Sequence, residues 1–494
     1  MGEEPNSVQA SEIQPSAGYP RHRFIILLIV LALLVIVIGA AQRIQGPGVE
    51  TGVVSEGSLE GDVAIKLSYA YGRWMSFAPA ASRQREQVEA FRREQRRSAI
   101  TWYQRAARED PSPSNIRPLI IIQYPSKRER EIKRLGAGAH ANARAEAAMW
   151  RSIYLAGGKL SLDQVDAYSA RIRGLKLGWY EHLALADLFE RAGLAAQAAE
   201  EDAEAARAAG RTVALLLVLL LVLALLGMLG IAAIIWYATT RNAARLDARD
   251  GSSELTPQVR SLAAGCLLET FVVYLAIVVG TQLAAAFALA SEVYGPGATN
   301  PVRAVLITAA VYAFAGLLSI AYLARRLRSA GWSWRTVGLT TRNPLRDVAW
   351  GIGGYAAALP LLVIASLLSR LLSRYVETPS NPVVPLFVES ETWVERLVLF
   401  GLAAIAAPFF EELFFRGVLY NSFRAKWGAR AGIMLSAAVF ASVHPLPLGF
   451  LPIFVLGFIF AVLVQHRGSL LPAMVAHGIN NCVAFTVLLI LTGS

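Results

Sequence analysis

Two neighbouring glutamates lie in an apolar stretch in the last fifth of the sequence. Glu411 and Glu412 stand between phenylalanines in Pro408-Phe-Phe-Glu-Glu-Leu-Phe-Phe-Arg416. A charged side chain near the middle of a bilayer costs at least ~2.5 kcal/mol, so such a residue faces the protein interior or marks function. A carboxylate in this setting can take a proton from water, which is the first step of many hydrolyses.

Two histidines and an asparagine follow in the same apolar region. His444 is the first histidine, and His477 lies four residues before Asn481. A spacing of four places imidazole and carboxamide on one helix face. There both can donate hydrogen bonds to a developing oxyanion or orient a water. Together with Glu411, these residues could form a buried hydrolytic site.

The two glutamates are expected to have different roles. Glu412 and Arg416 are four residues apart, which favours an ion pair on one helix face. Pairing lowers the cost of burying both charges. Glu411 points about 100° away around the helix and has no partner nearby in the sequence. We therefore expect Glu411 to be the chemical base and Glu412 to be mainly structural. In an alternative reading, both are helix-end charges at the membrane interface.

Membrane helices must position these residues. The sequence has 494 residues, of which 55% are hydrophobic and 17% are charged. Its long apolar runs predict an all-α fold, a polytopic transmembrane bundle with about nine spans. The spans expected after the first cover residues 212–237, 261–289, 302–324, 347–372, 395–422, 431–447, 449–465 and 470–491.

The part of the chain before the second span differs in composition. Residues 1–20 are expected to form a disordered tail and residues 21–41 an uncleaved N-terminal transmembrane anchor. Residues 42–211 are polar with helical periodicity and predict a soluble helical domain, inserted after the first span. Two of its stretches, 99–111 and 185–205, resemble fragments of the tetratricopeptide pattern, which stacks helix pairs and often binds peptides. An ordinary Ala-rich helical domain is the alternative.

The remaining chain divides into two parts. Residues 212–344 are expected to hold spans two to four and a basic loop, and residues 345–494 the chemical region. The net charge of +11 arises largely from arginines in short loops between spans, which indicates membrane orientation and no nucleic acid partner. Their distribution predicts a multi-pass protein of the bacterial cytoplasmic membrane, with a cytoplasmic N-terminus. Cys266 and Cys482 lie within apolar spans, so no disulfide or zinc–cysteine site is expected.

The ordered motifs of the last third resemble a known family. They are Glu411-Glu412-x-x-x-Arg416, Phe440-x-x-x-His444 and His477-x-x-x-Asn481. Over roughly residues 345–491 they resemble the CAAX protease and bacteriocin-processing family of intramembrane endopeptidases, also called the CPBP or ABI family. This resemblance implies hydrolysis of a peptide bond in a membrane-associated protein or peptide.

The resemblance also implies a role for each motif position. Glu411 and His444 would position and deprotonate the attacking water, and His477 and Asn481 would stabilise the tetrahedral oxyanion. The supporting residues would be Glu412 and Arg416, which hold the site, and Phe440, which packs beside it.

Metal dependence stays open at this stage. Glu411, His444 and His477 could complete a site for zinc or another divalent metal. No ligand-spaced motif favours it, so the expectation is a metal-free glutamate protease without a cofactor.

Two other functions compete with hydrolysis. The first is a non-catalytic scaffold in which residues 42–211 bind a protein partner, and the second is a transporter with a Glu/His proton relay. The partners expected for the protease are the bilayer, a membrane protein or peptide substrate, and a protein bound by residues 42–211.

Overall fold

Helices form all the regular structure in the described part of the chain. The computed structural model describes residues 19–44, 56–76, 82–109, 111–138, 142–240, 257–288, 301–372, 387, 390, 392–444 and 449–492. Within these ranges no strand occurs, which confirms the predicted all-α polytopic bundle. Of the predicted tail, residues 1–18 lie outside the described residues.

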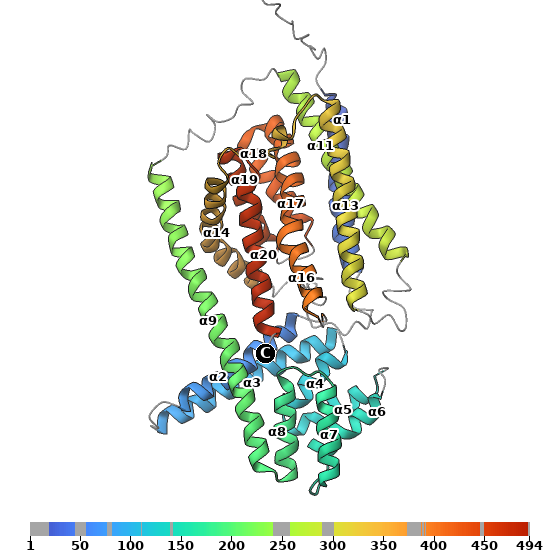
Figure 1. Cartoon of the computed structure of the whole chain (residues 1–494), viewed down its shortest axis with the longest axis vertical. Helices are drawn as coiled ribbons and strands as arrows, with labels where there is room; N and C mark the ends of the chain where they lie inside the picture. The colour runs from blue at the N-terminus through green and yellow to red at the C-terminus, as the bar shows by residue number, and fades with distance from the viewer. Residues whose placement is uncertain are drawn as a thin grey trace, which may run out of the picture.

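The long apolar helices stand side by side in a bundle (Figure 1). They are α1 (Arg21–Ile44), α9 (Ala195–Thr240), α11 (Pro257–Ala288), α13 (Pro301–Ser329), α14 (Pro344–Leu372), a compound helix of α16 (Trp393–Gly401), η3 (Leu402–Ala406), α17 (Ala407–Glu412), η4 (Leu413–Tyr420) and α18 (Asn421–Ser442), then α19 (Phe450–Arg467) and α20 (Leu471–Thr492). A short 3-10 turn, η2 (Trp334–Val337), precedes α14.

The described residues contain eight helices long and apolar enough to cross a membrane, where the sequence predicts about nine. The difference arises in the stretch Trp393–Ser442, which joins two predicted spans. Gly428 interrupts it with φ 84° and ψ 172°, a backbone conformation open to glycine. A Cβ on Gly432 would lie 3.0 Å from the main-chain nitrogen of Arg424. This short distance shows that the chain folds back at Gly428. The two predicted spans are thus two limbs joined at a glycine.

Polar helices lie at one end of the bundle, beside the C-terminal end of α20 (Figure 1). They are α2 (Glu56–Ser76), α3 (Ser82–Glu109), α4 (Pro113–Ile122), α5 (Pro125–Gly136), α6 (Ala143–Tyr154), α7 (Leu162–Gly174) and α8 (Tyr180–Ala192). With the first turns of α9 they enclose their own core, which includes Tyr103, Trp150 and Leu188. α9 continues from this core into the bundle as one helix of 46 residues.

One buried lysine joins the polar helices to the helix that carries His477. The Lys66 amino group of α2 donates a 3.0 Å hydrogen bond to the carbonyl oxygen of Leu491 in the last turn of α20. The final carbonyls of a helix have no donors within that helix, so Lys66 caps α20. Burial lowers the pKa of Lys66, and the neighbouring Asp62 opposes that shift. The polar helices are therefore attached to the helix of the candidate site.

Close packing of α9 on α14 depends on Gly230. A Cβ there would lie 2.0 Å from the main-chain oxygen of Ala356, whereas a Cβ on Gly227 would lie at an ordinary 3.7 Å from Leu359. We expect Gly230→Ala to separate the two helices and lower the melting temperature in detergent, because overpacking costs about 1–3 kcal/mol. Gly227→Ala is the matched control and should not lower it. Equal melting temperatures for the two variants would contradict this packing.

Candidate active site

The two glutamates lie between two widened turns of the compound helix. α17 ends at Glu412, and π-helical turns precede it (η3) and follow it (η4). π-helical turns inside helices are frequent at functional sites. They leave main-chain carbonyls for side chains to satisfy: Asn481 donates to the carbonyl of Ala403 at 2.7 Å, and Asn421 donates to that of Gly417 at 2.9 Å. Regular α-helical spacing does not predict these widened turns.

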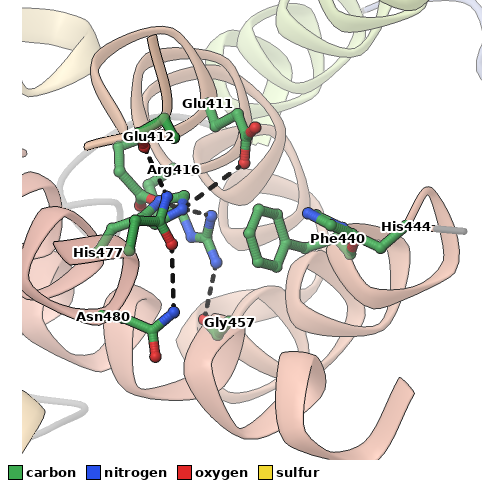
Figure 2. A network of polar contacts seen from close by, with 10 residues as sticks. Glu411, Glu412, Arg416, Phe440, His444, Gly457, His477 and Asn480 are labelled. Atoms are coloured by element: carbon green, nitrogen blue, oxygen red, sulfur yellow. Dashed lines mark hydrogen bonds and ion pairs between the residues drawn. The ribbon is translucent and has the colours of Figure 1, made fainter. Parts of the chain in front are cut away.

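Glu412 is the centre of a fully buried polar network (Figure 2). Its Oε1 accepts a hydrogen bond from Arg416 Nη1 at 3.0 Å and another from His477 Nδ1 at 2.9 Å. Glu412 and Arg416 have no exposed surface. The i,i+4 ion pair predicted from spacing is therefore present, and His477 joins it from α20.

Aromatic rings surround the Arg416 guanidinium. It lies 4.1 Å from the centroid of Phe440 and 5.2 Å from that of Phe460. Its Nη2 donates to the main-chain oxygen of Gly457 at 3.2 Å, as Figure 2 shows. A Cβ on Gly457 would lie 3.2 Å from Nη2 and 3.1 Å from Phe440, so glycine permits this approach. Cation–π contacts and the Glu412 bond offset the cost of burying Arg416.

Glu411 lies beside the network without a hydrogen bond of its own. Its Oε2 is 3.9 Å from His477 Nε2, and that oxygen is buried with no hydrogen-bond partner among the described residues. The side chain as a whole remains 20% exposed. As predicted, Glu412 pairs within its own helix and Glu411 has no partner nearby in the sequence; its contact with His477 comes from α20.

His477 links the two carboxylates. An ionised carboxylate only accepts hydrogen bonds, so the bond to Glu412 assigns the proton to Nδ1. Nε2 then faces Glu411. The imidazole also stacks on Phe460, with ring centroids 5.1 Å apart and an interplanar angle of 19°. Both contacts fix the ring plane.

His444 lies on the other side of the Phe440 ring from this network (Figure 2). Its ring is 4.7 Å from Phe440, edge on, and its Nδ1 lies 2.6 Å from the Phe440 carbonyl oxygen. That carbonyl accepts the bond, so Nδ1 carries the proton and Nε2 is an acceptor. The structure therefore brings Glu411, Glu412 and His477 together and sets His444 apart from them.

Asn481 is on the same helix as His477 but is engaged elsewhere. Besides its bond to Ala403, its Oδ1 accepts a 3.2 Å hydrogen bond from Asn480. A Cβ on Gly478 would lie 3.0 Å from the main-chain oxygen of Ala404, which shows how closely α20 approaches η3. One amide hydrogen of Asn481 is thus committed to the widened turn.

The metal ligands considered from the sequence are not gathered at one point in the described part of the structure. The set considered from the sequence was Glu411, His444 and His477, and Phe440 separates His444 from the other two. In the part of the chain that the structure describes, no three His, Cys, Asp or Glu side chains gather closely enough to hold one ion. The buried Arg416 already supplies a cation to Glu412, so a second cation there would be repelled.

Sequence reasoning missed Gly457 and Phe460. Both lie on α19, and in the sequence they are ordinary residues of an apolar run. Gly457 lies within a predicted span, and a small residue there is a sequence signal that another helix approaches closely. The contact of Phe460 with His477 has no sequence signal.

Comparison with known proteins identifies this region. A family model described as type II CAAX prenyl endopeptidase Rce1-like matches residues 393–483. No curated protein and no solved structure matches the chain. The match covers the compound helix, α19 and the first part of α20, and it confirms the resemblance seen in the motifs. Over residues 393–483 the chain is therefore similar to the Rce1-like type II CAAX prenyl endopeptidases.

Proposed function

We propose that the protein is an intramembrane endopeptidase that hydrolyses a peptide bond of a membrane-associated protein or peptide. The observation that carries this proposal is the placement of His477 between two carboxylates, 2.9 Å from Glu412 and 3.9 Å from Glu411. One carboxylate fixes the imidazole, and the other is free to take a proton. The family match supports a protease in general.

In the proposed reaction a water lies between Glu411 and His477 Nε2. Both are acceptors, so they can bind the two hydrogens of one water and direct its oxygen toward the substrate. Glu411 takes a proton as the water oxygen adds to the peptide carbonyl. The tetrahedral intermediate then collapses as that proton passes to the leaving nitrogen, and an acid and an amine are released.

His477 therefore helps to orient the water, which differs from the oxyanion role implied by family resemblance. Glu412 fixes its tautomer, as a carboxylate does for histidines in hydrolases. We keep His444 and Asn481 as site residues. His444 lines the side of the site beyond Phe440, and Asn481 holds the widened turn before Glu411.

We further propose that the reaction needs no metal. The support is the arrangement of the side chains: Glu412 Oε1 accepts hydrogen bonds from Arg416 and His477, and Phe440 lies between His444 and the network (Figure 2). The polar helices α2–α8 would then recruit a protein substrate or partner on the extracytoplasmic side of a bacterial membrane, with the N-terminus in the cytoplasm. Their attachment to α20 through Lys66 places them at the end of the bundle where α20 finishes.

Cleavage of a quenched-fluorescence peptide library by the purified full chain in detergent tests this function. We expect cleavage by wild type that is indifferent to a zinc chelator and is lost by about 10²-fold or more in His477→Ala. His466→Ala, which changes a histidine of α19 outside the network, is the matched control and should cleave normally. Loss of peptide cleavage with the chelator, and its recovery with added zinc, would show that the reaction needs a metal. A wild type that cleaves nothing would favour the scaffold function.

A further inference from the structure

Two tyrosines outside the family-matched segment approach Glu411. Tyr312 of α13 packs edge on against Phe410, with centroids 5.8 Å apart. Tyr274 of α11 stacks on Phe414 at 4.0 Å and 0°. Phe410 directly precedes Glu411 and Phe414 follows it within one turn, so both tyrosines pack against the turn that carries Glu411. Helices that precede the matched segment therefore contribute polar groups to the candidate site.

The position of Tyr312 is fixed by close helix packing. Gly316 lies one turn further along α13, and a Cβ there would lie 2.5 Å from ring atoms of Phe410. Phe410 directly precedes Glu411 in α17. Contact between α13 and α17 therefore holds the Tyr312 hydroxyl at a set place relative to the Glu411 carboxylate.

The Tyr312 hydroxyl is buried and makes no hydrogen bond with any described residue. Glu411 Oε2 is in the same condition. A buried polar group without a partner costs about 1–3 kcal/mol, so proteins rarely keep one without a reason. An unsatisfied donor on α13 and an unsatisfied acceptor on the segment that α13 contacts at Phe410 indicate a place where a polar group of a ligand binds.

Hydrolysis of a peptide bond requires more than one hydrogen-bond donor. The carbonyl oxygen of the substrate becomes negatively charged and needs hydrogen bonds. Arg416 and His477 donate to Glu412, and Asn481 has one amide hydrogen left beside its bond to the Ala403 carbonyl, so a second donor is needed. His477 Nε2 carries a proton only when the imidazole is charged. A neutral phenol keeps its proton throughout and can donate it in a hydrogen bond.

We propose that Tyr312 is a catalytic residue whose hydroxyl donates a hydrogen bond to the carbonyl oxygen of the scissile peptide bond. It stabilises the oxyanion of the tetrahedral intermediate and is not itself deprotonated. The water would attack from the side of Glu411 and His477, and Tyr312 would bind the oxygen from α13. This assignment rests on the proposed peptidase function and deepens it.

The test compares Tyr312→Phe with Tyr322→Phe, a tyrosine of the same helix that does not contact the site. Phenylalanine removes one oxygen and keeps the ring packing against Phe410. We expect kcat for peptide cleavage to fall about 10²–10³-fold in Tyr312→Phe, as for loss of one oxyanion donor. KM should stay within about twofold, and the shape of the pH profile should not change. Tyr322→Phe should match wild type in both parameters.

Three results would overturn the assignment. The first is a wild-type kcat in Tyr312→Phe. The second is a raised KM with unchanged kcat, which would make Tyr312 a residue for ground-state binding. The third is a shifted pH profile, which would mean that Tyr312 only tunes Glu411.

Folding and function need separate controls in the same experiment. Binding of a peptide to Glu411→Gln, with and without Tyr312→Phe, reports whether the site is intact, and we expect equal affinities. Weaker binding with Tyr312→Phe would overturn the assignment, because the hydroxyl would then act before the oxyanion forms. Wild-type cleavage by Glu411→Gln alone would instead refute the peptidase function. Loss of peptide cleavage in Glu411→Gln, together with full cleavage by Tyr312→Phe, would refute only the assignment of Tyr312.

Discussion

Glu411→Gln is expected to lower kcat for peptide cleavage by about 10³-fold and to leave the melting temperature unchanged. The glutamine amide has the shape of the carboxylate but cannot accept the proton of the attacking water, and a positioned general base contributes about 10²–10⁴-fold. Stability should not change, because Glu411 makes no hydrogen bond within the described residues and is 20% exposed.

The measurement is steady-state cleavage of one library-derived peptide, together with thermal unfolding in the same detergent. Glu269→Gln is the matched control, because Glu269 is another acid in an apolar helix and pairs with Arg326 at 3.2 Å, away from Glu411. Full activity in Glu411→Gln would remove the proposed base. A large fall in melting temperature would show that Glu411 has a structural role as well.

Arg416→Met is expected to destabilise the protein by about 3–5 kcal/mol. The substitution leaves the Glu412 carboxylate buried with only His477 as a partner, and removing one member of a buried ion pair has an effect of this size. Both side chains are fully enclosed, so solvent cannot replace the lost contact. Peptide cleavage should fall as well, because Glu412 would no longer hold His477 in place.

A double-mutant cycle measures this coupling. Glu412→Gln in the Arg416→Met background should recover part of the lost stability, because a neutral amide replaces the uncompensated charge. The control is Arg207→Met, which breaks a half-exposed pair with Glu204 and should barely change the melting temperature. Unfolding of each variant in mild detergent gives the comparison. If the stability losses of Glu412→Gln and Arg416→Met simply add in the double variant, the two charges do not stabilise one another.

Several features of the site follow from spacing along the sequence. Residues four apart meet on a helix, so Glu412 and Arg416 were expected to pair, and their 3.0 Å contact agrees with that expectation. The same rule left Glu411 without a local partner. Long apolar runs indicated the membrane helices, and the ordered motifs indicated the family. Each of these inferences uses contacts within one helix or a pattern of composition.

Other features depend on which helices pack together, and no local pattern encodes that. The hydrogen bond of His477 with Glu412 joins residues 65 positions apart in the chain. His444 was expected beside Glu411, yet Phe440 lies between it and the network. The spans predicted at 395–422 and 431–447 are two limbs that fold back at Gly428, and hydropathy does not predict the positive φ of 84° that allows this reversal.

By itself, the sequence determined the helical class, the apolar spans, the Glu412–Arg416 pair and the resemblance of the last third to a protease family. These depend on periodicity and spacing, which act over one or two helical turns. Only the tertiary structure decided the partners of His477, the enclosure of Arg416 by Phe440 and Gly457, and the packing of Tyr312 on Phe410. The reason is physical: a buried side chain takes its partners from whichever helices touch it, and those contacts are set by packing across the whole bundle.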